Sequence, residues 1–282
     1  MKKYKINKLK IVRVTLGIIL TTLLTALFLD FSRILPTGLH SIAHFQLIPA
    51  ILFTIADIPI QLIILAALIL LFGRLYCSTL CPLGILQDFI AWLSKKIVKN
   101  KKYKYAKPLN ILRYIFLFAM IIFFATGVGS LIGLLDPYSI YGRIAANLFK
   151  PIVLAINNLL AFIFEITGDY YFFEEKIFIL SFLSFIISVI SFAIVGILSA
   201  LMGRKFCNII CPVGTLLGLV ARFSLFKIKI KKADCKTCGL CEHVCKSQCI
   251  NSKEQKIDLS RCVCCFNCIG SCNRGAISYK FK

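Results

Sequence analysis

Long apolar runs separated by short polar stretches dominate the sequence. A weaker run at Ile152–Ile166 contains Asn157 and Asn158, so we expect it to lie at a membrane interface or to re-enter the membrane. The other runs approach or exceed the roughly 20 residues that a helix needs to cross about 30 Å of hydrocarbon. The pattern therefore predicts four transmembrane helices, at residues 11–29, 51–72, 111–135 and 177–202.

The composition agrees with an integral membrane protein. Of the 282 residues, 59% are hydrophobic and 16% are charged, whereas soluble domains have about 45–50% apolar and about 25% charged residues. The 34 Lys and Arg against 12 Asp and Glu give a net charge of +22. Because both nucleic-acid-binding proteins and cytoplasmic membrane loops are basic, the positions of the cations must decide between these classes.

The cations occupy three of the stretches that flank the apolar runs. They precede the first run, separate the second from the third, and follow the fourth. Cytoplasmic loops are enriched in Lys and Arg, so both chain ends and the central loop are expected in the cytoplasm. The first run is not followed by a small-residue cleavage pattern and is expected to remain as an anchor. Membrane topology accounts for the charge, and nucleic acid is not expected as a partner.

A twelve-residue motif occurs twice, each time directly after an apolar run. Residues 73–84 read GRLYCSTLCPLG, and residues 203–214 read GRKFCNIICPVG. We infer two parallel repeats, each with two spans, the motif and a following helix. The proline of each motif suits the first position of that helix. The cysteine before it then lies at a helix N-terminus, where the helix dipole favours a thiolate.

The four motif cysteines are expected at one depth on the cytoplasmic side; they are Cys77, Cys81, Cys207 and Cys211. Two facing pairs supply enough thiolates for an iron–sulfur cubane or for one tetrahedral metal ion. The alternative is two pairs of membrane-edge thiols that the cytosol keeps reduced. The residues alone leave both interpretations open.

The chain after Lys232 is polar and rich in cysteine. The spacing Cys-x2-Cys-x2-Cys-x3-Cys occurs from Cys235 to Cys245 and again from Cys262 to Cys272. This is the bacterial spacing for two [4Fe–4S] clusters, in which the fourth cysteine of each set binds the other cluster. The first cluster should therefore be bound by Cys235, Cys238, Cys241 and Cys272, and the second by Cys262, Cys265, Cys268 and Cys245.

Other uses of these cysteines fit less well. Zinc ribbons use pairs of Cys-x2-Cys, and disulfides are rare in the cytosol. The proline that usually follows the fourth cysteine is replaced by Lys246 and Asn273, so we expect altered geometry or potential with the clusters retained. Of the two extra cysteines, Cys249 is expected to be a small buried residue and Cys264 a bystander beside a ligand.

Two domains follow from these features. Residues 1–227 should form an all-α membrane bundle of four transmembrane helices, arranged as two parallel two-helix repeats. Residues 228–282 should form a small cytoplasmic α+β domain, a bacterial-type ferredoxin with two [4Fe–4S] clusters.

The paired cysteine-proline motifs, the apolar runs and the cysteine-rich tail together resemble the NapH-type membrane ferredoxins. The same modules are similar to the membrane portions of NosR-type regulators and of oxidase-assembly ferredoxins. The resemblance implies electron transfer between the quinone pool and a partner redox protein of a respiratory or assembly system. It also implies quinol as a donor and clusters on the cytoplasmic face of a prokaryotic inner membrane. We expect an electron-transfer subunit and not a stand-alone enzyme.

Other functions and residues stay open. A redox-sensing regulator or a metalloenzyme assembly factor would use the clusters or the membrane-edge dithiols. A transporter is disfavoured because few charged groups lie deep in the spans. Asp57, in the second run, is a candidate proton acceptor or quinol ligand, or else a carboxylate that reaches the outer interface. His40 and His44 have the i, i+4 spacing of a helical metal or haem pair, or are interfacial.

Overall fold

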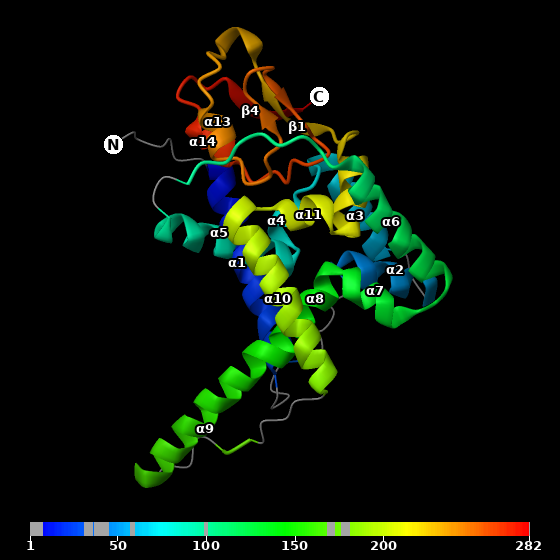
Figure 1. Ribbon diagram of the computed structural model, residues 1–282, viewed down its shortest axis with the longest axis vertical. Helices are drawn as coiled ribbons and strands as arrows, with labels where there is room; N and C mark the ends of the chain where they lie inside the picture. The colour runs from blue at the N-terminus through cyan, green and yellow to red at the C-terminus, as the bar shows by residue number, and fades with distance from the viewer. Residues whose placement is uncertain are drawn as a thin grey trace.

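The structure is a computed structural model that describes residues 8–30, 36, 45–56, 60–98, 101–167, 173–175 and 181–281. Apolar helices form most of the molecule, and a small domain of short strands and helices covers one end of them (Figure 1). The membrane part and the cysteine-rich tail are therefore in direct contact.

The first half of the membrane part contains the first copy of the motif. Its helices are α1 (Lys8–Leu29), α2 (Leu47–Ala56), α3 (Ile60–Phe72), α4 (Tyr76–Thr79) and α5 (Pro82–Ile97). Pro82 stands in the first turn of α5, and Cys81 is its N-cap residue. The proline lacks an N–H that this position does not need, so the helix begins where the motif predicts.

The second half repeats this succession at its end. Its elements are α6 (Asn110–Ala125), α7 (Gly129–Leu135), α8 (Pro137–Ile144), a π-helical turn (Ala145–Phe149), α9 (Lys150–Thr167), α10 (Phe182–Met202), α11 (Lys205–Ile209) and α12 (Pro212–Ala221). The order of α10, α11 and α12 matches that of α3, α4 and α5. Each copy of the motif thus forms a short helix, a break at the second cysteine, and a longer helix.

The four predicted spans are confirmed only in part. Within the described residues, three helices are long and apolar enough to cross a membrane: Lys8–Leu29, Pro137–Ile166 and Phe182–Met202. The first and third of these correspond to predicted spans. The predicted span 51–72 corresponds to α2 and α3, with residues 57–59 outside the described part. Within the predicted span 111–135, helix α6 ends at Ala125. Gly127 follows with a φ of +69°, and a separate helix, α7, begins at Gly129.

The run at Ile152–Ile166 differs from the prediction. It belongs to a continuous helical stretch of 30 residues, Pro137–Ile166, instead of a short interfacial helix. The two asparagines do not interrupt it, because their side chains bond to the segment after the helix. The Asn157 amide donates to Phe173 O at 2.9 Å, and the Asn158 amide donates to Glu175 O at 2.8 Å.

The tail folds around two small antiparallel sheets. Strand β1 (Phe226–Ile230) pairs with β4 (Ile277–Phe281), and β2 (Ile250–Asn251) pairs with β3 (Lys256–Ile257). A 3-10 turn (Lys232–Asp234) and the short helices α13 (Leu240–His243) and α14 (Asn267–Ser271) carry the connections. The core of this domain contains apolar side chains together with cysteines: Ile228, Ile250, Ile277, Cys245, Cys262 and Cys268.

The basic loop between α5 and α6 lies along the tail (Figure 1). Tyr103 N donates to His243 O at 3.1 Å, and Ala106 N donates to Gln248 O at 3.3 Å. Tyr103 itself is only 2% exposed. From its cations, this loop was expected to act in membrane topology alone, but its hydrogen bonds also hold the tail against the membrane part.

Candidate functional site

The two copies of the motif meet, and their four cysteines are buried. Cys77 lies in α4 and Cys207 in α11, while Cys81 and Cys211 cap α5 and α12. None of these side chains is more than 4% exposed. Burial raises the pKa of the Cys81 thiol, and the nearby Cys207 and Cys77 raise it further. The thiols therefore influence one another across the repeats, and burial outweighs the helix dipole that was expected to favour a thiolate.

The arginines of the two motifs reach across to each other's cysteine. The Arg204 guanidinium donates to the carbonyl of Cys77, and Arg74 Nη2 donates to the carbonyl of Cys207 at 3.2 Å. Both arginines are fully buried. This reciprocal contact fixes the two motifs against each other about an approximate two-fold axis.

The last glycine of each motif permits this approach. A Cβ atom on Gly84 would lie far closer than 3.0 Å to the carbonyl oxygen of Cys77, and one on Gly214 would meet the carbonyl of Cys207 in the same way. The added atom would also press on Arg204 and Arg74, respectively. Only glycine lets the first turn of α5 pack on the carbonyl of Cys77 and the first turn of α12 pack on the carbonyl of Cys207.

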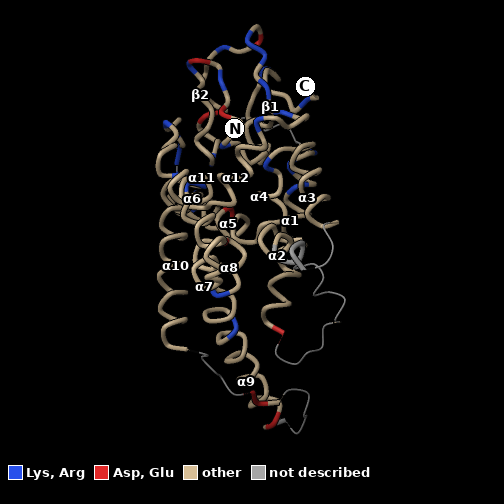
Figure 2. Tube along the Cα trace, turned by 90° about the vertical axis from the view of Figure 1, so that its right-hand side faces the viewer, with Lys and Arg blue, Asp and Glu red and all other residues tan. Residues whose placement is uncertain are grey.

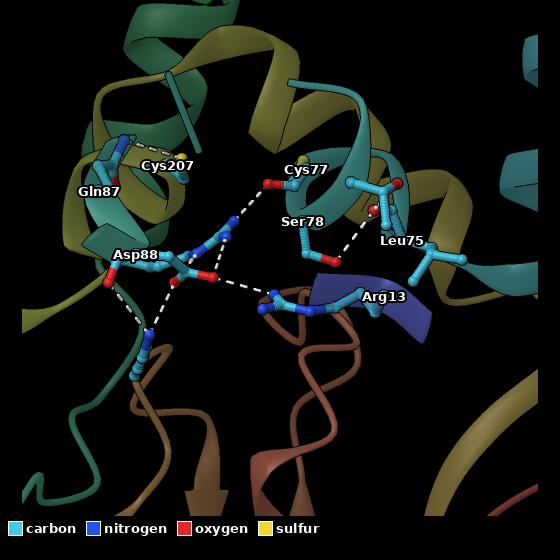
Figure 3. Close-up of polar contacts among 10 residues, drawn as sticks. Arg13, Leu75, Cys77, Ser78, Gln87, Asp88 and Cys207 are labelled. Carbon is cyan, nitrogen blue, oxygen red and sulfur yellow. Dashed lines mark hydrogen bonds and ion pairs between the residues drawn. The ribbon is translucent and has the colours of Figure 1, made fainter. Parts of the chain in front are cut away.

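Asp88 on α5 collects three cations from distant parts of the chain (Figure 3). It accepts from Arg13 Nη1 at 2.9 Å, from Arg204 Nε at 3.0 Å, and from Lys246 Nζ at 3.2 Å. Burial alone would raise the pKa of this carboxyl group, but Arg204, Lys246 and Arg13 together hold it well below its ordinary value. One carboxylate thus joins α1, the second motif and the tail.

Arg74 and Arg113 are buried without such a partner. Arg74 donates to Ser260 O at 2.7 Å and to Asn208 Oδ1 at 2.9 Å, and Arg113 Nη2 donates to Ser260 O at 3.3 Å. Among the described residues, no carboxylate oxygen lies within 4.0 Å of either guanidinium. Buried charges are normally paired. This junction therefore carries an excess of positive charge, which anionic iron–sulfur clusters with four thiolates would balance.

The second set of tail cysteines surrounds one cavity. Cys245, Cys262, Cys265 and Cys268 all line it, and so does Cys249. Its other walls are mostly apolar side chains, which include Ile228, Ile250, Val263 and Phe266. The structure thus brings together the four cysteines that the spacing assigns to one cluster, although Cys245 is far from the others in sequence. An apolar cavity lined by these thiols is the kind of site that would hold a cubane.

The first set lies at a more exposed position. Cys235, Cys241 and Cys272 are half-buried and Cys238 is exposed. Burial raises the pKa of Cys241 to about 11, with Cys235 and Cys238 as contributing neighbours. The helices α13 and α14 pack together, which brings Cys241 and Cys272 to the same side of the domain.

The two extra cysteines differ in position. Cys264 does not line the cavity, because its Sγ lies 3.5 Å from the carbonyl oxygen of Phe72 in the membrane part. Cys249 is 1% exposed, and its Sγ lies 3.6 Å from that of Cys245.

A single metal ion fits the described side chains poorly. No three His, Cys, Asp or Glu groups within the described ranges are arranged to hold one ion. The ligands of one zinc ion must converge to about 2.3 Å from the metal, whereas the sulfur ligands of a cubane are spread over its corners.

Several residues that matter in this geometry were not expected from the sequence. Asp88, Gln87, Arg13 and Lys246 fall outside the repeated motif. One signal was available, since Asp88 lies four residues after the first motif and is the acidic residue of a helix otherwise rich in apolar side chains. Asp57, His40 and His44 lie outside the described residues.

Comparisons with known proteins agree with this picture. A family model described as a 4Fe-4S binding domain matches residues 55–101 and 183–232, so each match contains one cysteine-proline motif. An uncharacterized protein of Methanocaldococcus jannaschii, MJ0749, is 28% identical over 80% of this chain and 74% of its own length. No solved structure gave a significant match.

Other relatives carry functional names. The ferredoxin-type protein NapH of Haemophilus influenzae is 26% identical over 73% of this chain and 64% of its own length. The methylamine utilization ferredoxin-type protein MauN of Paracoccus denitrificans is 26% identical over 61% of this chain and 48% of its own length. Through the repeated 4Fe-4S match and these relatives, the chain is similar to the NapH-type ferredoxins, and both findings support an iron–sulfur electron-transfer protein.

Proposed function

We propose that this membrane protein passes electrons from a quinol to a partner redox protein through three [4Fe–4S] clusters. Two clusters are bound by the tail, and the third is bound by the four motif cysteines, which we call the motif centre. The observation that carries the proposal is the cavity lined by Cys245, Cys262, Cys265 and Cys268, which adjoins the buried motif cysteines. The clusters supply one-electron chemistry, and the chain's task is to bind them at suitable potentials and separations.

The motif centre is supported by the reciprocal packing of the two motifs. The matches to a 4Fe-4S binding domain cover these repeats and leave most of the tail outside. Gln87 Nε2 donates to Cys207 Sγ at 3.2 Å (Figure 3), a contact of the kind that adjusts the potential of an iron–sulfur cluster. The excess of buried arginine charge around these cysteines favours an anionic group there.

A quinol site is supported by a cavity of about 270 Å³ in the membrane part. Residues of α6, α7, α8, α10 and α11 line it, and among them only Ser191 is polar. Phe206 and Ile210 form part of the wall, and they flank Cys207 and Cys211 in the sequence. An apolar ring bound there would lie beside the motif centre. Asp57, the residue proposed from the sequence as a quinol or proton site, lies outside the described residues.

The charge distribution supports an orientation with the tail in the cytoplasm. Lys and Arg concentrate at the tail end of the molecule, where a few acidic residues also lie, and further acidic residues lie at the ends of α1 and α9 that are distant from the tail (Figure 2). Because cytoplasmic segments are enriched in Lys and Arg, the tail and its clusters face the cytoplasm in this proposal. The partner is then a cytoplasmic redox protein or a cytoplasmic part of a membrane complex.

Iron content tests the number of clusters. The full chain, purified anaerobically, is expected to contain about 12 iron atoms. The variants Cys77→Ser and Cys207→Ser are each expected to contain about eight, because each lacks a ligand of the motif centre. Ser78→Ala, beside Cys77, serves as the control and should keep the full content. A wild-type content near eight that neither serine variant changes would contradict the motif centre, and a content near zero would contradict the whole proposal.

A further inference from the structure

We propose that the second tail cluster, bound by Cys245, Cys262, Cys265 and Cys268, exchanges electrons with the motif centre, and that Arg74 is the positioning residue between them. The first tail cluster then faces the partner protein. This inference rests on the proposed function, because it assigns an order to the same clusters.

Packing places the second tail cluster against the membrane part. Val263 and Cys265 pack into the apolar core that also contains Cys77, Cys81 and Cys211. In contrast, Cys241 and Cys272 of the first set pack only against the core of the tail domain, and Cys238 is exposed. The second set therefore lies between the motif centre and the first set.

Polar contacts join the same two sites. Lys246, which follows the ligand Cys245, bonds to Asp88 beside the motif centre at 3.2 Å. Ser260, two residues before Cys262, accepts from Arg74 Nη1 at 2.7 Å. Through its other terminal nitrogen, Arg74 donates to the carbonyl of Cys207 at 3.2 Å. One guanidinium thus touches the backbone beside a ligand of each centre.

The two motif arginines differ in how their charge is balanced. Arg204 is paired with Asp88, with Nη2 2.8 Å from Oδ2. Arg74 occupies the same motif position, is equally buried, and has only neutral acceptors among the described residues. Position 218, which corresponds to Asp88 in the second repeat, is glycine. The two repeats therefore differ at this arginine: Arg204 has a carboxylate partner, whereas Arg74, which lies between the two centres, has none among the described residues.

An unbalanced buried cation stabilises the reduced state of a nearby cluster. A cubane with four thiolates gains one negative charge when it accepts an electron, and the attraction to a buried guanidinium is strong because the surroundings exclude water. In the proposed step, the motif centre is oxidised by one electron and the second tail cluster is reduced by one. A quinol would supply two electrons, one at a time, to the motif centre and become the quinone, and its two protons would be released to water. The second tail cluster would pass each electron to the first tail cluster, which would pass it to the partner.

A redox titration followed by electron paramagnetic resonance tests the role of Arg74. The substitution Arg74→Gln is made in the full chain. At a fixed potential, the ratio of reduced to oxidised second tail cluster is expected to fall at least tenfold. This corresponds to a midpoint about 59 mV lower for a one-electron centre. The motif centre should shift in the same direction, and the exposed first cluster should not. Arg74→Lys, which keeps the charge, should restore most of the shift.

Unchanged midpoints in an Arg74→Gln protein that carries all its iron would overturn the role of Arg74. The order of the clusters has a separate test that leaves Arg74 intact. Cys238→Ser should leave the motif centre and the second tail cluster magnetically coupled, which broadens their signals in the fully reduced protein. Cys265→Ser, which leaves the first tail cluster and the motif centre, should show little broadening. Equal broadening in both variants would overturn the order, whereas a chain without clusters would instead contradict the proposed function.

Discussion

Asp88→Asn is expected to lower the free energy of unfolding by about 3–5 kcal/mol, measured by denaturant unfolding of the chain in detergent micelles. The substitution removes the one carboxylate that faces Arg13, Arg204 and Lys246, so two buried arginines and one half-buried lysine lose their carboxylate partner. Because these cations hold the pKa of Asp88 below its ordinary value, the carboxylate stabilises the fold above about pH 4. This contribution is lost only as the pH falls further.

Asp234→Asn is the matched control for Asp88. Asp234 lies 3.8 Å from Lys231, and both side chains are more than half exposed. Exposed ion pairs of this kind contribute about 0–1 kcal/mol, so the control should unfold almost as the wild type does. If Asp88→Asn is no less stable than Asp234→Asn, then the junction between the membrane part and the tail does not depend on this carboxylate.

Cys265→Ser is expected to remove one cluster, about four iron atoms per chain, from protein purified anaerobically. Cys265 lines the thiol-rich cavity with the other three cysteines of the second set. Cys264→Ser should keep the wild-type iron content, because Cys264 does not line that cavity, and its side chain instead contacts the Phe72 carbonyl and the thiol of Cys262. These neighbouring cysteines therefore form a matched pair, measured by iron analysis and by the intensity of the cluster signals.

The opposite result would change the assignment of ligands. If Cys264→Ser lost iron and Cys265→Ser kept it, the second set would be shifted by one residue along the chain. Cys265 lines the cavity and Cys264, which has a positive φ of 50°, does not, so we expect only one of the two to bind a cluster.

Local patterns in the sequence predicted the elements of the site. The repeated prolines placed the starts of α5 and α12, and the cysteine spacing assigned four residues that the structure gathers around one cavity. These features depend on residues close in sequence, where backbone preferences act directly. The convergence of the two motifs also followed, because repeats of one fold tend to pack about a common axis.

Contacts between distant segments were not predictable in the same way. Asp88 meets Arg13, 75 residues away, and Lys246, 158 residues away, and nothing in either local sequence marks these pairs. The membrane helices show a second reason. The pair Asn157 and Asn158 led to the prediction of an interfacial or re-entrant helix, but these residues lie within a continuous helical stretch, Pro137–Ile166. Their amides bond to carbonyls of the following segment, a contact that the local sequence does not reveal.

Reduction of the clusters by a quinol tests the central claim most directly. The full chain is placed in lipid vesicles without oxygen, a quinol analogue is added, and the signals of reduced [4Fe–4S] clusters are followed by electron paramagnetic resonance. Ile194 lines the apolar cavity and Ile197 of the same helix does not. The account predicts cluster reduction in the wild type and in Ile197→Trp, and its loss in Ile194→Trp at unchanged iron content. Clusters that dithionite reduces but the quinol does not, or equal reduction in both variants, would contradict it.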